Sequence, residues 1–589
     1  MASAFLIGYV ILSVIVVAFV NKRLAAKRRK KETALPVIEA ETSQQAAVAV
    51  QQETISSKTI EPENIQEEAQ EEIGAEVARE IHSPEEEPKK RTGAVLAVLL
   101  FGMFIAILNQ TLINVALPVM MSDFNVSTST AQWLMTGFML VNGIMIPISA
   151  FLILKYGFRK LFILSMLSFT IGSLICAVSG TFTIMMIGRV IQAIGAGVLM
   201  PLGTNVFMTL FPPEKRGAAM GTMGIAMILA PAIGPTLTGW VIQHYEWNLM
   251  FYGMFILGIV DILLATRLFH LKSETVDLKL DVFSLVTSSI GFGGLLYGFS
   301  EAGNNGWDSA EVILSLMIGI ISLVIFVWKQ LVSETPMLNM NVFKFNMFTF
   351  TLLINSIITM ALFGGMLLLP VYLQNIRGFT PMESGLLLLP GALIMGLMGP
   401  IAGKIFDKYG IRWLAVVGLA ITTYGTYEFT HLTADTPYRS ILMIYILRSF
   451  GMSLIMMPIM TAGMNVLPMK LIAHGTAMSN TIRQVAGSIG TAFLVTIMTR
   501  QSSFHMADYE NQVTTTNSFI QNKVAALSQA FGGGESGYMK SVLTLYSEGM
   551  KLSTIKGIND AFVVATVLAG IALLLAFFLP SKKKGIAKP

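Results

Sequence analysis

Residues 93–118 have the sequence GAVLAVLLFGMFIAILNQTLINVALP, which contains no charged side chain. Because an α-helix rises 1.5 Å per residue, this stretch would form a helix about 39 Å long. The hydrocarbon core of a bilayer is about 30 Å thick, and about 20 apolar residues are enough to cross it. The stretch therefore predicts a transmembrane helix.

Similar apolar stretches follow along most of the chain. Of its 589 residues, 54% are hydrophobic and only 13% are charged, whereas charged residues make up about a quarter of a typical soluble protein. This composition excludes a water-soluble fold and predicts an all-α membrane protein whose main body has fourteen spans. Their expected positions are 93–118, 131–154, 159–179, 182–205, 217–240, 248–269, 283–300, 310–329, 349–372, 384–405, 413–430, 440–460, 475–499 and 557–580.

Basic residues are concentrated in alternate loops of this pattern. In the other short loops, the only Lys or Arg residues are Arg377 and Arg439. Since cytoplasmic loops carry the excess of Lys and Arg, we expect the basic loops and the C-terminus to lie in the cytoplasm. The net charge of +5 is spread over loops and tails, which favours this orienting role over a nucleic-acid surface. Residues 500–556 are expected to form the one long external loop.

The two ends of the chain differ from the main body. Residues 1–31 place an apolar stretch before a basic flank, the reverse of a cleavable signal peptide, so we expect an uncleaved membrane anchor. Residues 32–91 are expected to be a disordered cytoplasmic linker, because residues 32–88 hold 15 Glu and no aromatic side chain and cannot bury a core. Residues 581–589 form a basic cytoplasmic tail.

Several motifs occur twice in the main body. The repeated pairs are 156–159 (YGFR) with 409–412 (YGIR), 214–221 with 473–479, and Arg189 with Arg448. They match spans two to five with spans ten to thirteen. We therefore expect an N-terminal six-helix bundle at 92–270, an inserted helix pair at 271–345, and a C-terminal six-helix bundle at 346–580. Duplicated halves around a central path are typical of transporters.

Three motifs make the chain similar to a known family. Residues 108–118 (LNQTLINVALP) resemble the first-helix signature of the major facilitator superfamily, 230–239 (APAIGPTLTG) its fifth-helix antiporter motif, and 189–192 (RVIQ) a fourth-helix motif. Within that superfamily the chain resembles the fourteen-helix drug:proton antiporters, and the Asn-Gln pair resembles the lincomycin-efflux type. The resemblance covers residues 92–580. It implies a proton-coupled multidrug efflux transporter that exports amphipathic organic compounds from a bacterial cytoplasmic membrane by alternating access.

The fifth-span motif has a physical explanation. Gly234 and Gly239 let neighbouring helices approach closely, while Pro231 and Pro235 remove backbone donors and bend the helix. We expect a rigid, kinked contact between the two halves, which the family resemblance associates with export. The alternative is that Gly and Pro are simply frequent in membrane helices.

The loop after the tenth span is a candidate gate. It contains Asp407 and Arg412, and the matching loop of the N-terminal half contains Gly157 and Arg159. Such a cluster can pair across the two halves and hold the cytoplasmic end shut. The position that matches the carboxylate is Leu154 in the N-terminal half, so the gate is charged on one side only. Alternatively, these basic residues serve only to orient the protein.

Acids inside the spans are candidates for proton coupling, because burying a charge in hydrocarbon costs at least about 2.5–3.5 kcal/mol. Many relatives place such an acid on the first helix, where this chain has Asn109. We therefore expect Glu428 or Asp261 to carry the proton, with Arg189 as a neighbouring charge. The alternatives are that water from the adjacent external loop reaches Glu428 and that Asp261 either forms a structural pair with Arg267 or is a snorkelling carboxylate.

Other polar residues inside the spans are candidates for lining the substrate cavity. They are Asn109, Gln110, Asn114, Asn142, Asn355, Arg448 and Arg483. The commoner use of such amides is to hydrogen-bond between helices, and Arg483 could instead reach the headgroups.

Two other functions stay open at this stage. Three intramembrane Arg against few acids favour an exporter of a lipid or lipid precursor, and the N-terminal extension leaves room for a sensor or scaffold that binds a partner protein. The expected partners of the main body are a small amphipathic organic substrate, protons and membrane lipids. The single cysteine excludes an intrachain disulfide, and neither a metal site, a cofactor site nor an enzyme motif is expected.

Overall fold

The computed structural model describes residues 89–271, 275–276, 281–512 and 518–580, and these residues form helices joined by short connections. The α-helices are α3 (Lys89–Phe124), α4 (Thr128–Tyr156), α5 (Phe158–Ala177), α6 (Phe182–Leu210), α7 (Arg216–His244), α8 (Asn248–Leu268), α9 (Val282–Asn305), α10 (Ala310–Val332), α11 (Asn346–Val371), α12 (Pro381–Tyr409), α13 (Arg412–Glu428), α14 (Tyr438–Ser453), α15 (Met456–Met464), α16 (Met469–Gln512), α17 (Ser518–Ala530) and α18 (Gly534–Ala576). Short helical turns are η1 (Met340–Lys344), η2 (Tyr372–Ile376) and η3 (Phe429–His431). The expected anchor, most of the linker and the C-terminal tail lie outside the described residues.

Thirteen helical segments of the described chain are long and apolar enough to cross a membrane. One of them is formed by α14 and α15 together. Helix α13, at the eleventh predicted span, is a further helix of 17 residues. A helix satisfies all its backbone hydrogen bonds internally, which is why apolar stretches in a bilayer adopt it. The prediction of an all-α membrane fold is confirmed.

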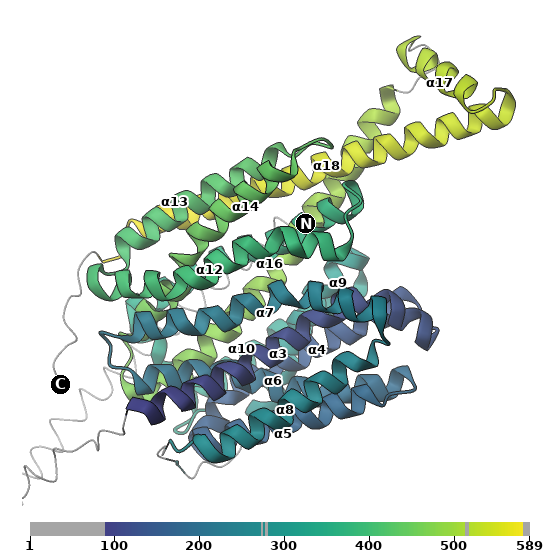
Figure 1. Cartoon of the computed structure of the whole chain (residues 1–589). Coiled ribbons are helices and arrows are strands. Elements are labelled where there is room, and N and C mark those ends of the chain that lie inside the picture. The colour runs from purple at the N-terminus through teal and green to yellow at the C-terminus, as the bar shows by residue number, and fades with distance from the viewer. Residues whose placement is uncertain (1–88, 272–274, 277–280, 513–517, 581–589) are drawn as a thin grey trace, which may run out of the picture. The chain divides into compact units, whose positions relative to one another are not determined.

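Among the helices before residue 270, α4, α5, α6 and α8 pack on one another, whereas α7 packs mainly on α12. Helix α5 lies against α6 and α8, and α4 lies against α6, as Figure 1 shows. Later in the chain, α11 packs on α16 and α18, and α13 packs on α14 and α18. The division into two six-helix bundles stays a prediction.

The twelfth predicted span is broken between α14 and α15. Pro458 lies in the first turn of α15 and has no backbone N–H. Its ring also clashes with the carbonyl of the residue four positions earlier in a continuous helix, and that residue, Leu454, lies in the break. The proline therefore explains why one span consists of two helices.

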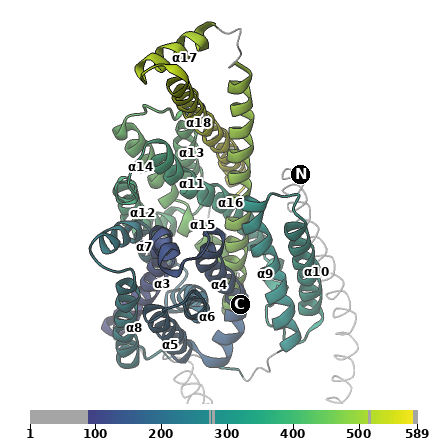
Figure 2. The same cartoon turned by 90° about the vertical axis from the view of Figure 1, so that its right-hand side faces the viewer.

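The predicted inserted pair, α9 and α10, lies where the two halves meet. Helix α9 packs against α4 and α16 as well as α10, and α10 lies farther out, as Figure 2 shows. A Cβ at Gly143 of α4 would lie 2.3 Å from Leu296 of α9 and 3.6 Å from Gln484 of α16, so three helices converge at this glycine. The Trp307 indole N–H donates to Thr496 Oγ1 of α16 at 2.7 Å.

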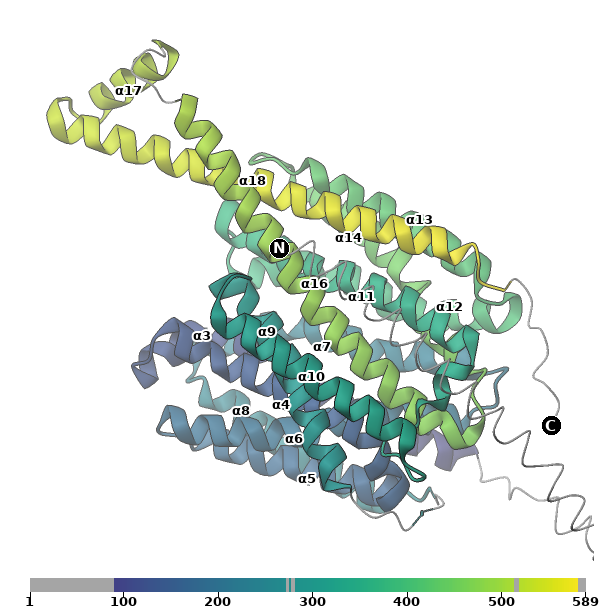
Figure 3. The same ribbon diagram turned by 180° about the vertical axis from the view of Figure 1, so that it is seen from behind.

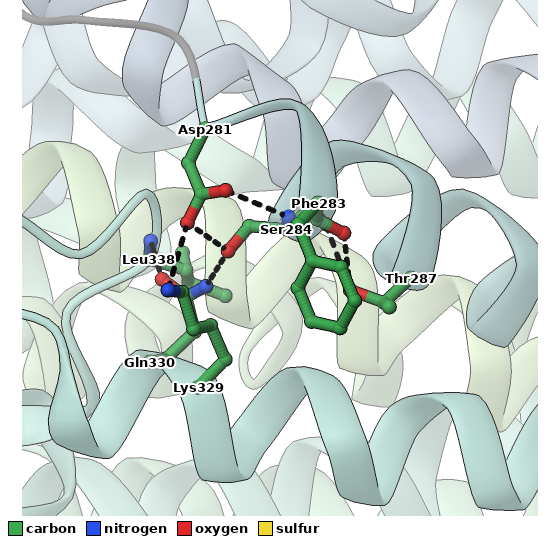
Figure 4. Close-up of polar contacts among 7 residues, drawn as sticks. All are labelled: Asp281, Phe283, Ser284, Thr287, Lys329, Gln330 and Leu338. Atoms are coloured by element: carbon green, nitrogen blue, oxygen red, sulfur yellow. Dashed lines mark hydrogen bonds and ion pairs between the residues drawn. The ribbon is translucent and has the colours of Figure 1, made fainter.

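Polar contacts join the start of α9 to the end of α10, as Figure 4 shows. Asp281 accepts hydrogen bonds from the Ser284 backbone N–H at 3.2 Å and hydroxyl at 2.8 Å, so it caps α9. Gln330 of α10 donates to Ser284 Oγ at 2.7 Å and accepts from the Leu338 N–H at 3.0 Å. Although burial acts to raise it, the hydrogen bonds from Ser284 and the charge of Lys329 hold the pKa of Asp281 below its ordinary value.

The predicted external segment 500–556 is largely helical. Helix α16 continues to Gln512, α18 already begins at Gly534, and α17 lies at the tip of this arm, as Figure 3 shows. The segment contains no proline, and its only run of glycines is 532–534. With no proline to interrupt them, the two spanning helices can continue beyond the hydrocarbon region.

Candidate functional site

Helices α7 and α12 come from different halves and touch backbone to backbone. A Cβ at Gly221 would lie 2.2 Å from the Gly399 carbonyl oxygen, and one at Gly403 would lie 2.1 Å from the Gly217 carbonyl oxygen. In each helix the two glycines of this contact are four residues apart, which places them on one face of the helix. Small residues at this spacing let membrane helices approach closely. The two helices therefore meet along a glycine seam, residues 217, 221, 399 and 403, near the end of the molecule that carries the basic loops, called the basic end below.

The fifth-span motif occupies the other end of α7. Gly234 faces α3, where a Cβ would lie 2.2 Å from Thr111 Oγ1. Gly239 faces α12, where a Cβ would make an ordinary contact at 3.6 Å. Pro231 and Pro235 lie within the helix. The motif thus places α7 between the first helix of its own half and a helix of the other half.

Asp407 binds the N-terminus of α7 across the two halves. Its two carboxylate oxygens accept hydrogen bonds from the backbone N–H groups of Gly217 and Ala218, each at 3.0 Å. These N–H groups have no partner within their own helix, and the positive end of the helix dipole lies there. Beside them, Arg216 donates to Asn465 Oδ1 of the other half at 3.3 Å. The sequence did not single out α7 as the partner of Asp407.

The other expected gate residues lie elsewhere around this end. Arg159 donates to the Thr266 carbonyl oxygen at the end of α8, at 2.7 Å. Gly157 has φ of +72°, a left-handed conformation that suits glycine, and it separates α4 from α5. The Nε of Arg412 has no hydrogen-bond partner among the described residues. Within the described part of the chain, Asp407 is the one of these four residues that makes a hydrogen bond between the halves.

Asp261 is fully buried in the N-terminal half. Its side chain points at α3, because a Cβ at Gly102 would lie 2.6 Å from Asp261 Oδ2 and 2.9 Å from Phe162. Neither carboxylate oxygen has a hydrogen-bond partner among the described residues, so the alternative of a pair with Arg267 does not hold. An ionised carboxylate without a partner is costly in such a site. The group needs a proton or another ligand there.

Arg189 is also buried, on α6, and it contacts neutral groups. Its Nε donates to the Leu134 carbonyl oxygen at 3.1 Å and its Nη1 to Gln192 Oε1 at 3.1 Å. The guanidinium lies over the Phe138 ring, 4.1 Å from the centroid. Stacking of this kind stabilises an Arg cation without an acid.

Gln192 links Arg189 to two further helices. Its Nε2 donates to Ser173 Oγ of α5 at 2.7 Å, and its Oε1 accepts from Asn109 Nδ2 of α3 at 3.4 Å. The motif 189–192 pointed to this glutamine, whereas no sequence signal distinguished Ser173 from other small residues in spans. The result is a buried polar network of Arg189, Gln192, Ser173 and Asn109.

Comparison with known proteins identifies the family. The sequence model of the Major Facilitator Superfamily matches residues 99–491. The chain is 48% identical to an uncharacterized MFS-type transporter, YhcA, of Bacillus subtilis over 85% of this chain and 95% of that protein. The chain belongs to the major facilitator superfamily. Its membership assigns transport across a membrane and not an enzymatic reaction.

Two further major facilitator relatives carry functional names. The lincomycin resistance protein LmrB of Bacillus subtilis is 36% identical over 83% of this chain and 96% of its own length. The multidrug export protein EmrB of Escherichia coli is 28% identical over 83% of this chain and 96% of its own length. Among solved structures, the human organic anion transporter MFSD10 matches 83% of this chain and all of its own with a TM-score of 0.55 at 13% identity, which shows the shared fold. The chain is thus a multi-pass major facilitator transporter related to drug efflux proteins of bacteria.

In this major facilitator protein the second acid expected to carry the proton, Glu428, lies at the periphery. It is the last residue of α13 and is half-buried. Its side chain hydrogen-bonds with that of Tyr424, which is 56% exposed. Of the two acids expected from sequence, Asp261 is the one inside a helix bundle.

The remaining cavity candidates are spread over both halves. Arg448 donates to Thr426 Oγ1 at 3.2 Å and Arg483 to Asn480 Oδ1 at 2.8 Å, both within the C-terminal half. Asn355 is buried beside a small void of about 10 Å³. Asn142 and Gln110 are half-buried, and the Asn114 side chain lies outside the described part of the structure.

Proposed function

We propose that this transporter exports amphipathic organic compounds in exchange for protons. It lies in the bacterial cytoplasmic membrane with its basic loops and C-terminus inside. The observation that carries the coupling is the buried carboxyl group of Asp261, which no described residue partners. The names of the relatives, a lincomycin resistance protein and a multidrug export protein, support the substrate class.

The proton cycle follows from the surroundings of Asp261. In the proposed cycle the halves first lie together at the basic end, where the glycine seam joins α7 to α12 and Asp407 binds the N-terminus of α7. Asp261 then carries a proton, because its ionised form would lack any partner. Rocking of the halves separates α7 from α12 and admits water from the cytoplasm, and the carboxyl group releases its proton there. Substrate moves in the opposite direction during the return step.

Helix α3 connects this carboxyl group to the buried polar network. Gly102, next to Asp261, and Asn109, bonded to Gln192, are seven residues apart on α3. Seven residues make about two turns, so both positions lie on nearly the same face. A shift of α3 when substrate binds therefore changes the contacts of Asp261 and of Arg189 together. Substrate binding and proton release are then coupled through the same helix, α3.

Transport in proteoliposomes tests the proposal. An imposed pH gradient should drive labelled lincomycin and an amphipathic dye against their own gradients with the unmodified chain. Asp261→Asn should keep probe binding and exchange at equilibrium but lose the response to the gradient. Asp435→Asn, at an exposed position near the external ends of α13 and α14, is the matched control and should behave as the unmodified chain.

Other results would decide against this assignment. Gradient-driven transport by Asp261→Asn at the normal rate would exclude Asp261 as the proton carrier. The same loss in Glu428→Gln alone would transfer the role to Glu428. If no probe responds to the gradient in the unmodified chain, the antiport proposal itself fails.

One observation favours a second candidate function, export of a lipid or lipid precursor. Arg189, Arg448 and Arg483 lie inside spans, and among the described residues none has a carboxylate within 4.0 Å. Unpaired guanidinium groups suit an anionic headgroup. Deletion of the gene should then change envelope lipid composition without changing resistance to amphipathic compounds, whereas the opposite pattern supports drug export.

A further inference from the structure

A cavity of about 600 Å³ opens beside the closed seam, at the basic end of α7 and α12. Its lining includes Phe211, Lys215, Ala219, Lys404, Asp407 and Lys408. Lys215 belongs to the N-terminal half, and the residues numbered above 400 belong to the C-terminal half. The cavity therefore has walls from both halves.

The charge of this cavity is positive. The ammonium groups of Lys215, Lys404 and Lys408 are on exposed residues, and within the described chain none forms an ion pair shorter than 4.0 Å. The one acid of the lining, Asp407, already accepts two backbone hydrogen bonds. Three cations facing one engaged carboxylate attract an anion.

The exposed face of α12 shows what kind of anion fits. Leu397 and Ile401 are 68% and 48% exposed, and with Lys404 and Lys408 they follow one another at intervals of three or four residues. These positions lie on one face of the helix. The face is apolar toward the middle of the bilayer and basic at the end of the span, where lipid headgroups lie. Phe211 and Ala219 add apolar surface to the cavity itself.

We infer that this cavity binds the headgroup of an anionic phospholipid. The phosphodiester oxygens lie among the three ammonium groups, and an acyl chain runs along Leu397 and Ile401. Basic pockets between membrane helices at the cytoplasmic side are suited to such headgroups. A free phosphate shares the headgroup chemistry but makes no use of the apolar face.

The bound lipid also acts on the gate. A single headgroup contacts Lys215 and Lys404 together only while the ends of α7 and α12 meet, as they do in this structure. A ligand that binds one conformation better shifts the equilibrium toward it. Anionic lipid therefore holds the basic end closed and slows the opening step. This inference does not depend on the substrate or on the proton carrier.

Lipid binding to the purified full-length chain tests the inference directly. Phosphatidylglycerol retained by the protein is titrated by native mass spectrometry, with phosphatidylcholine as the zwitterionic reference. The double variant Lys404→Gln/Lys408→Gln should bind phosphatidylglycerol at least tenfold more weakly than the unmodified chain. Lys155→Gln/Lys160→Gln is the matched control, because it removes the same charge from the corresponding loop of the N-terminal half, outside the cavity.

Equal weakening in both double variants would attribute binding to general electrostatics and overturn the inference, as would no weakening in either. Binding of inorganic phosphate to the unmodified chain as tightly as phosphatidylglycerol would overturn the choice of a lipid. Thermal unfolding of all variants checks that each remains folded. Transport is not measured in this experiment, so its outcome is separate from that of the antiport proposal.

Discussion

Replacing Asp407 by Asn should open the basic end of the transporter. The carboxylate accepts hydrogen bonds from two backbone N–H groups at 3.0 Å each, at the positive end of α7. A hydrogen bond to a charged group contributes about 1.5–3 kcal/mol net, and the helix dipole adds about 0.3–1 kcal/mol at a partly exposed site. An amide can keep one of the two bonds but loses the charge.

The expected loss is therefore about 2 kcal/mol, which corresponds to about a 30-fold shift in the ratio of closed to open gate. The seam glycines remain in Asp407→Asn, so the fold itself should be preserved. Asp407→Glu keeps the charge on a longer side chain. Its ratio of closed to open gate should therefore lie between that of the unmodified chain and that of Asp407→Asn.

Distances between spin labels measure this shift. The single native cysteine, Cys176, is buried and can be replaced by Ser, which leaves cysteines introduced at Glu214 and Tyr409 as the only labelling sites. Both positions are exposed at the basic end, one in each half. Asp407→Asn should increase the population with a long distance, whereas Asp435→Asn should not. Identical distance distributions in Asp407→Asn and the unmodified chain would refute the gate reasoning.

Three further substitutions have expected outcomes. Gly221→Ala puts a methyl group 2.2 Å from a backbone oxygen of α12 and should lower both melting temperature and transport, whereas Gly253→Ala, with nothing within 4 Å of the new methyl group, should leave both unchanged. Arg189→Lys loses the stacking and the forked donors and should cost about 1–3 kcal/mol of stability, measured by thermal unfolding against Arg439→Lys. Asp281→Asn should lower the melting temperature at pH 7. This difference should shrink as the pH falls below about 4, because a carboxyl group whose pKa is lowered by folding stabilises the fold only while it is ionised. A difference in melting temperature that persists at low pH would contradict this explanation.

The positions of the helices could be predicted from sequence because they depend on local chemistry. An apolar stretch such as 93–118 must satisfy its backbone hydrogen bonds within itself in a bilayer, so its length and composition are sufficient. The break before Pro458 also depends on local chemistry, because a proline ring clashes with the carbonyl of the residue four positions earlier. The twelfth span was nevertheless expected to be a single helix. The helical arm of α16 and α18 was expected as a loop, because its polar composition differs from that of a span.

The sequence by itself determined that the chain crosses a membrane many times and which rare ionisable groups deserve a functional explanation. Only the tertiary structure decided their partners. Asp407 meets the N-terminus of α7 and not a basic side chain, while Asp261 meets a glycine of α3 and no hydrogen-bond partner among the described residues. The reason is that helix formation depends on residues within four positions of one another, whereas these contacts join helices far apart in the chain. Their distances depend on how closely small residues such as Gly221 and Gly102 let the helices approach.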